Sequence, residues 1–97
     1  MPEERHLLID DMRNIRADRV ARTFEAGIKA LEEEIWDVLW LDHDLGQEDG
    51  KDGTGIMNWL EAHPDRLPKR IVCVSSNPVG RDRITKISRR LLKKRGV

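Results

Sequence analysis

The sequence predicts an α/β fold built on a four-stranded parallel sheet. The main observation is a set of three short apolar runs without polar alternation, at residues 7–9, 38–41 and 71–74. Such runs are typical of strands that are buried on both faces, as in parallel sheets. Helical patterns separate the later runs, and this alternation favours right-handed crossovers within one sheet. With 97 residues, the chain is expected to form a single domain spanning residues 1–97.

The first half of the chain is expected to supply three strands and one helix. Residues 6–9 form the first strand, residues 12–19 form a loop, and residues 20–23 form a weak strand at the sheet edge. Thr23 can cap a helix, because its hydroxyl can accept a hydrogen bond from a first-turn N–H group. That helix has an apolar stripe with helical spacing, made of Phe24, Ile28, Leu31 and Ile35. Residues 38–41 form the central strand.

The second half is expected to supply two helices and the last strand. After a glycine-rich acidic loop, Thr54 opens a helix that Pro64 stops after His63. Residues 70–74 form the fourth strand, and Pro78 is well placed to begin the last helix. The apolar positions expected to face the core are Ile56, Met57, Trp59 and Leu60 in the first of these helices, and Ile84, Ile87 and Leu91 in the second. Gly96 can end the last helix.

Polar residues follow each of the three apolar runs. Because parallel strands point the same way, the residues beyond their ends meet at one edge of the sheet, where open α/β sheets bind ligands. The sequence therefore predicts one pocket at this edge. The residues expected there are Asp10, Asp11, Asp42, Asp44, Ser75 and Asn77.

The gathered aspartates predict a metal site. Carboxylates brought close together repel one another and stay ionised only beside a compensating cation. Oxygen ligands favour a hard ion, and a few carboxylates with several waters suit Mg²⁺ bound together with a substrate phosphate. The expected ligands are Asp10, Asp11, Asp42 and Asp44. The alternative is that some of these aspartates cap helices or form turns.

The segment from Ser75 to Pro78 predicts an anion site where the last strand runs into the last helix. Hydroxyl, amide and free backbone N–H groups at a helix N-terminus form a seat for phosphate. We expect Ser75, Ser76 and Asn77 to contribute to it, and Arg81 to add a charge-assisted contact. His43 directly follows Asp42 and is a candidate acid or base.

These residues resemble the response-regulator receiver domain. The acidic pair after the first strand, the aspartate after the third and the serine after the fourth carry the likeness. The longer segments at residues 41–46, 53–55 and 75–81 are closer to a receiver-derived family, the cyclic-phosphate-processing receiver domain. The resemblance spans roughly residues 6–92. It implies a shortened flavodoxin-like fold with strand order 2-1-3-4, flanked by helices.

The resemblance also implies roles for individual residues. Asp10 and Asp11 would hold Mg²⁺, Asp42 would occupy the phosphoacceptor position, and Ser75 would contact the phosphoryl group. The implied function is Mg²⁺-dependent phosphoryl handling, with a cyclic phosphate or nucleotide-type substrate. The sequence departs from the pattern in two ways: it lacks a fifth strand ending in lysine, and Val74 stands where the family often has histidine. The alternative is a non-catalytic module that senses phosphate or binds a protein partner or a second copy.

Charge is unevenly distributed along a chain whose net charge is zero. Residues 32–65 carry eleven acidic residues against Lys51, and residues 66–97 carry eleven basic residues against Asp82. The two segments can attract each other within the fold, or the basic one can attract phosphates. No apolar run is long enough to span a membrane, and the lone Cys73 lies in an apolar strand, so no intrachain disulfide is expected. We expect a cytoplasmic protein with a buried thiol.

Overall fold

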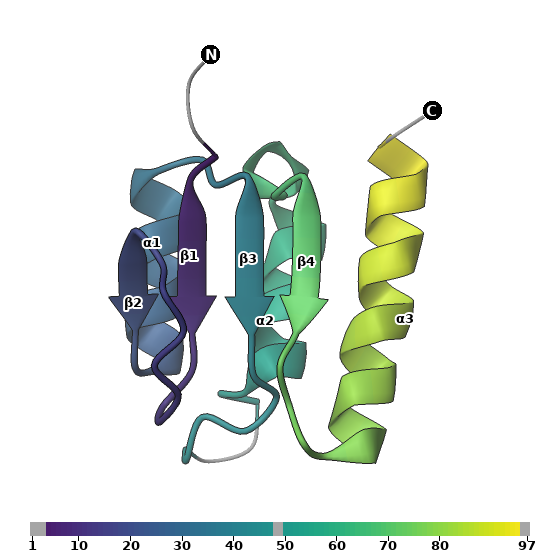
Figure 1. The fold of residues 1–97 in the computed structure, drawn as a ribbon. Helices are drawn as coiled ribbons and strands as arrows, with labels where there is room; N and C mark the ends of the chain where they lie inside the picture. Colours follow the sequence, from purple (N-terminus) through teal and green to yellow (C-terminus); the bar gives the residue numbers. More distant parts are fainter. Residues whose placement is uncertain (1–3, 48–49, 96–97) are drawn as a thin grey trace.

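A computed structural model describes residues 4–47 and 50–95 of the chain. It contains four strands and three helices, with a short 3-10 turn at Pro64–Arg66 (η1) (Figure 1). The strands are β1 (His6–Ile9), β2 (Arg19–Ala21), β3 (Val38–Leu41) and β4 (Arg70–Cys73). The helices are α1 (Phe24–Glu33), α2 (Gly53–Ala62) and α3 (Pro78–Arg95). None of the helices in these ranges has both the length and the apolar character needed to cross a membrane.

The four strands form one parallel sheet in the order β2-β1-β3-β4, which confirms the predicted order. The register places Leu8 opposite Trp40, and Trp40 opposite Val72. β1 and β3 therefore pair along their full lengths without an offset, and their carboxyl ends lie at the same level of the sheet. Backbone hydrogen bonds extend the pairing past both strands, because the Asp42 N–H donates to the Ile9 carbonyl at 3.0 Å and the Asp10 N–H donates to the Ala21 carbonyl at 3.1 Å.

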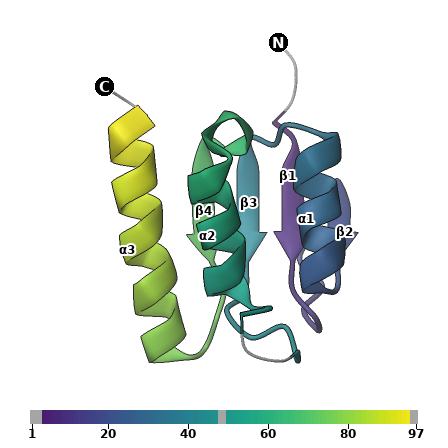
Figure 2. The same cartoon turned by 180° about the vertical axis from the view of Figure 1, so that it is seen from behind.

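The main core lies between the sheet and its helices. Helices α1 and α2 cover one face of the sheet, whereas α3 lies beside β4 at its edge (Figures 1 and 2). Alternate strand residues point into this layer, because successive side chains of a strand face opposite ways. The fully buried strand residues of the cluster are Leu7, Ile9, Leu39 and Leu41, which pack with Leu31, Ile56, Met57, Leu60 and Ile84 from the helices.

Helix α1 begins as predicted but ends earlier. The Thr23 hydroxyl accepts a hydrogen bond from the Ala26 N–H at 3.1 Å, so the predicted cap is confirmed. The prediction that Ile35 belongs to the buried stripe is wrong, since the helix stops at Glu33 and Ile35 is 63% exposed. Trp36 is buried instead, and its indole N–H donates to the Ala30 carbonyl at 2.9 Å. The same carbonyl accepts a hydrogen bond from the Glu34 N–H at 3.2 Å, so the indole adds a second hydrogen bond at the end of the helix.

The other element boundaries differ from the predictions by one or two residues. Asp52, not Thr54, caps α2, because its carboxylate accepts a hydrogen bond from the Gly55 N–H at 2.8 Å. The second strand is Arg19–Ala21, slightly earlier than predicted, and the fourth ends at Cys73. Helix α3 begins at Pro78 as predicted. The predicted helix end at Gly96 lies outside the described residues.

Strand β4 is less buried than its apolar sequence predicts. It is the edge strand of the sheet, and Ile71, Val72 and Cys73 are only partly buried. The prediction of a strand buried on both faces is therefore wrong for β4, and Cys73 is a half-buried free thiol. An apolar run alone cannot distinguish a central strand from an edge strand.

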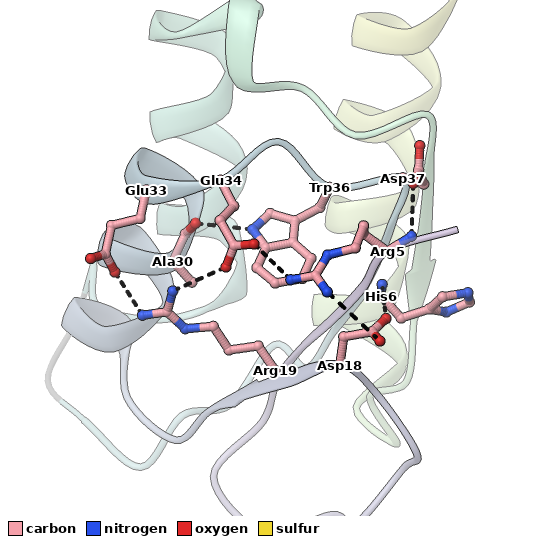
Figure 3. Close-up of polar contacts among 9 residues, drawn as sticks. All are labelled: Arg5, His6, Asp18, Arg19, Ala30, Glu33, Glu34, Trp36 and Asp37. Carbon is pink, nitrogen blue, oxygen red and sulfur yellow. Dashed lines mark hydrogen bonds and ion pairs between the residues drawn. The ribbon is translucent and has the colours of Figure 1, made fainter. Parts of the chain in front are cut away.

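Ion pairs fasten the sheet at the amino-terminal ends of its strands (Figure 3). Arg5 donates to Glu34 at 2.6 Å, and Arg19 donates to Glu33 at 2.7 Å. The Asp37 carboxylate accepts a hydrogen bond from the Arg5 backbone N–H at 2.7 Å and lies 3.3 Å from the ammonium of Lys69. These contacts neutralise part of the acidic segment inside the fold. Glu61 and Arg90 form a second pair that joins the acidic and basic segments.

We expect Asp37→Asn to destabilise the domain at neutral pH. The hydrogen bond from the Arg5 N–H holds the pKa of Asp37 below its usual range, against the opposing effect of burial, and Lys69 adds to the lowering. A carboxylate whose folded-state pKa is lowered stabilises the fold above its unfolded pKa, and this contribution disappears as the pH falls through the folded value. Urea midpoints of variant and wild type should therefore differ at pH 7 and converge below about pH 4.

The control for this comparison is Asp65→Asn. The Asp65 side chain is 76% exposed and lies 3.7 Å from the neighbouring Arg66, so its removal should change little. A midpoint difference for Asp37→Asn that persists at low pH would show that the variant acts through packing rather than through charge.

Candidate metal and phosphate site

Three carboxylates converge at the carboxyl edge of the sheet. Asp10 and Asp11 follow β1, and Asp42 follows β3, the strand that pairs with it. Ligand oxygens of all three lie within 4.8 Å of one another. Asp10 and Asp42 are buried and Asp11 is partly exposed. The parallel register thus brings together the three aspartates that directly follow these two strands in the sequence.

Asp10 is held as a carboxylate by the turn that follows it. Its Oδ1 accepts hydrogen bonds from the backbone N–H groups of Met12 at 2.9 Å and Arg13 at 3.0 Å. Burial by itself raises the pKa of Asp10, but these two bonds and the Arg13 guanidinium together lower it below its usual range. Asp10 is therefore a fixed negative charge at the end of β1.

The pKa of Asp42 is shifted in the opposite direction, above its usual range. Burial raises the pKa of Asp42, and the nearby charge of Asp10 raises it further. Arg13, a backbone hydrogen bond from Asp44 and a hydrogen bond from the Ser75 side chain partly offset this rise. The two carboxylates thus differ in basicity, and Asp42 is the stronger base. Ser75 is itself buried, so the residue predicted to follow β4 does reach Asp42.

Arg13 is the site residue that sequence reasoning missed. Its Nη1 lies 3.3 Å from Asp10 Oδ2 and 3.5 Å from Asp42 Oδ2, so one guanidinium contacts both buried carboxylates. Arg13 lies in an unpatterned loop among several other arginines, and nothing in the local sequence separates it from them. The one available signal was its position three residues after Asp10, which lets it fold back within a turn.

The other predicted phosphate ligands lie around the start of α3. Ser75 Oγ accepts a hydrogen bond from the Asn77 N–H at 3.1 Å. The Asn77 side-chain oxygen accepts hydrogen bonds from the N–H groups of Val79 and Gly80, at 3.1 and 3.2 Å, so it caps α3. Ser76 and Arg81 are exposed and line a hollow on the outer side of α3.

Asp44 and His43 lie outside the three-carboxylate cluster. The Asp44 carboxylate is exposed and accepts a hydrogen bond from the Gly46 N–H at 2.9 Å, which shapes the turn where Gly46 has a φ of +67°. The His43 ring packs against Gly80, where an added Cβ would come within 2.2 Å of it. Its Nε2 lies 3.8 Å from Asp52, and its buried Nδ1 has no hydrogen-bond partner within the described ranges.

Comparison with protein families identifies the chain. The family model described as the cyclic-phosphate processing receiver domain matches residues 5–90, nearly the whole chain. The protein belongs to this family. Searches of curated proteins and of solved structures found no match. The family match agrees with the strand order and with the aspartates at the carboxyl edge.

The acidic cluster of this cyclic-phosphate processing receiver domain suits Mg²⁺, the ion that receiver domains commonly bind through acidic residues. The donor set consists only of carboxylate oxygens, which is the chemistry that Mg²⁺ prefers. A cation is already in contact with the cluster, since the Arg13 guanidinium lies beside Asp10 and Asp42. The residues present therefore fit a divalent cation, with Asp10, Asp11 and Asp42 as its protein ligands.

Mg²⁺ is expected to raise the melting temperature of the domain. Ion binding to the folded state stabilises it by mass action, and here it would also relieve repulsion among Asp10, Asp11 and Asp42. Asp11→Asn should reduce the Mg²⁺-induced shift, whereas Asp65→Asn, at an exposed position beside Arg66, should leave it unchanged. Thermal melts with and without millimolar Mg²⁺ test this. Identical wild-type melts under both conditions would contradict a metal site here.

Proposed function

We propose that this domain is a Mg²⁺-dependent enzyme that opens a cyclic phosphate, of a nucleotide-type substrate, to a phosphomonoester. The observation that carries the proposal is the juxtaposition of three converging carboxylates with the buried Ser75, next to the first turn of α3. The site has an acidic side, which suits a metal, and a side with the Ser75 hydroxyl at the positive end of the α3 dipole, which suits a phosphate.

Asp42 is the residue we assign to the chemical step. It is buried at the end of β3, within the cluster of three carboxylates and beside Arg13. It would take a proton from water as the water oxygen attacks phosphorus. Alternatively, it would itself attack phosphorus, and water would then cleave the resulting acyl phosphate to release the phosphomonoester and restore the Asp42 carboxylate. One ring P–O bond breaks, and the departing sugar oxygen takes up a proton. Bound Mg²⁺ would supply charge neutralisation at the phosphoryl oxygens.

Ser75 and the start of α3 would bind the phosphate. The Ser75 hydroxyl already reaches Asp42, so a phosphoryl group beside Asp42 lies within its reach. The positive end of the α3 dipole favours negative charge at the same place. Arg81 is exposed and lies about one turn into α3, and its positive charge would attract the phosphate.

The test is incubation with Mg²⁺ and a panel of 2′,3′-cyclic, 3′,5′-cyclic and linear nucleotides. Chromatography measures product, and calorimetry measures binding in parallel. We expect a phosphomonoester only from a cyclic substrate and only with Mg²⁺, with weaker binding in Ser75→Ala and Arg81→Ala. Binding without turnover on every compound would instead favour a phosphate sensor.

The edge of the sheet at β4 supports a second candidate function, in which the domain is a non-catalytic module that binds a protein. β4 pairs with β3 on one side only, and no strand in the described part of the chain pairs with its outer side. Such open edges can pair with another chain. Between β4 and α3 lies a largely apolar groove of about 630 Å³, lined by residues that include Ile71, Cys73 and Leu92. A second copy would fit this role. Sedimentation should then show a concentration-dependent dimer in the wild type that is lost in Leu92→Lys.

A further inference from the structure

The Arg13 guanidinium contacts the same carboxylates, Asp10 and Asp42, that would bind a shared metal ion. Its Nη1 is 3.3 Å from one carboxylate and 3.5 Å from the other, and the ligand oxygens of these residues and Asp11 lie within 4.8 Å of one another. The guanidinium cannot give up its proton near neutral pH, so its charge is permanent. A second cation brought to the same oxygens would therefore meet both repulsion and competition for lone pairs.

The loop holds the Arg13 backbone by hydrogen bonds, whereas the Arg13 side chain is partly exposed and is held by its contacts with the two carboxylates. The Arg13 N–H donates to Asp10 Oδ1 at 3.0 Å, and its carbonyl accepts a hydrogen bond from Arg22 at 2.6 Å. Arg22 also donates to the Asp10 carbonyl at 3.2 Å and to Asn14 at 2.6 Å, which braces the turn. The Arg13 side chain, in contrast, is 38% exposed, so part of it already lies in solvent.

We propose that Arg13 is an internal counterion of the acidic cluster that Mg²⁺ must displace, so that this residue sets the metal affinity of the site. The inference rests on the proposed metal site and adds its regulation. Without metal, Arg13 offsets the repulsion between two buried carboxylates and stabilises the fold. With metal, the same two oxygens serve the ion, and the guanidinium moves away. Arg13 thus weakens metal binding in exchange for stability of the metal-free domain.

The test compares Arg13→Gln and Arg13→Lys with a matched control, Arg16→Gln. Arg16 lies in the same loop but lines a hollow with Glu4, His6 and Asp18, away from the cluster. Thermal melts in a metal chelator measure the stability of the metal-free domain, and calorimetric titration with Mg²⁺ measures affinity. Circular dichroism confirms that each variant is folded.

Arg13→Gln is expected to melt at a lower temperature than the wild type without metal and to bind Mg²⁺ about tenfold more tightly, since a close and partly exposed charge is removed. Arg13→Lys keeps the charge and should stay near the wild type, and Arg16→Gln should match the wild type in both measurements. Binding by Arg13→Gln alone, with none in the wild type, would support the competition by Arg13 but would contradict a Mg²⁺-dependent function of the wild type.

Two outcomes would overturn the inference in distinguishable ways. If the wild type binds Mg²⁺ and Arg13→Gln binds it equally or more weakly, the metal site stands and the displacement of Arg13 is wrong. If neither protein binds Mg²⁺, the metal dependence of the proposed function fails, and the inference fails with it.

Discussion

Asp42→Asn is expected to abolish turnover of a cyclic phosphate while leaving the domain folded. The substitution keeps the shape of the side chain and the backbone hydrogen bond from Asp42 to Ile9, which holds β3 beside β1. It removes the base or nucleophile, so activity should fall by at least about 10²-fold. The metal-free domain should become more stable, because the lost charge is the one that burial and Asp10 disfavour.

The matched control is Asp44→Asn. Asp44 lies two residues further along the chain, but its carboxylate is exposed and bonds to the Gly46 N–H outside the three-carboxylate cluster. Product formation with Mg²⁺ and thermal melts with a chelator are measured on both variants. Equal loss of activity in the two would show that the loop after β3, rather than the Asp42 carboxylate, determines turnover.

Gly53→Ala is expected to be strongly destabilising and to disturb the acidic cluster. A Cβ at this position would lie 2.5 Å from the Asp42 carbonyl oxygen and 2.8 Å from the His43 Cα. Both atoms are backbone, so no side-chain rotation relieves the overlap, and the end of β3 must shift. We expect a loss of about 1–3 kcal/mol in the free energy of unfolding. For a domain of this size, each kcal/mol lowers the melting temperature by about 4–8 °C.

Thr54→Ala tests whether this effect belongs to Gly53 or to the helix start in general. The Thr54 hydroxyl is buried, with no hydrogen-bond partner in the part of the chain that is described, so its removal should cost little. Gly53→Ala should also reduce the Mg²⁺-induced rise in melting temperature, because it moves the backbone that carries Asp42. Melting curves of Gly53→Ala that match the wild type would refute the crowding argument.

The parts of the fold that follow from local sequence patterns were predictable. β1 and β3 lie at the predicted residues, and the aspartates that follow them converge because parallel strands in register end at one level. The cap at Thr23 needed only a hydroxyl before an apolar stripe. In each case the deciding interaction lies within a few residues or follows from the direction of the strands.

The parts that depend on packing were not predictable. Ile35 and Trp36 both follow α1, and helical spacing favours Ile35, but the indole N–H of Trp36 reaches the Ala30 carbonyl and buries the larger ring instead. The half-burial of β4 follows from its edge position, which its apolar residues do not reveal.

The residues of the candidate site were predictable only where the strands determine their positions. Asp10 and Asp42 were predicted to meet because their strands place them, whereas Arg13 meets them through the course of an irregular loop. Asp44 was predicted as a fourth ligand, but its carboxylate accepts a hydrogen bond from the Gly46 N–H of its own loop. Side chains in loops are directed by the turn, and a single sequence gives little information on turns.

The ion pairs around Arg5 and Asp37 and the acidic cluster around Asp42 lie at opposite ends of the same strands. Five residue steps separate Arg5 from Asp10 and Asp37 from Asp42 along β1 and β3, which corresponds to about 17 Å in a strand. This exceeds the Debye length of about 8 Å at physiological salt, so charges at one end are largely hidden from those at the other. Substitutions among the ion pairs at the amino-terminal end should therefore change thermal stability without changing the electrostatic environment of Asp42.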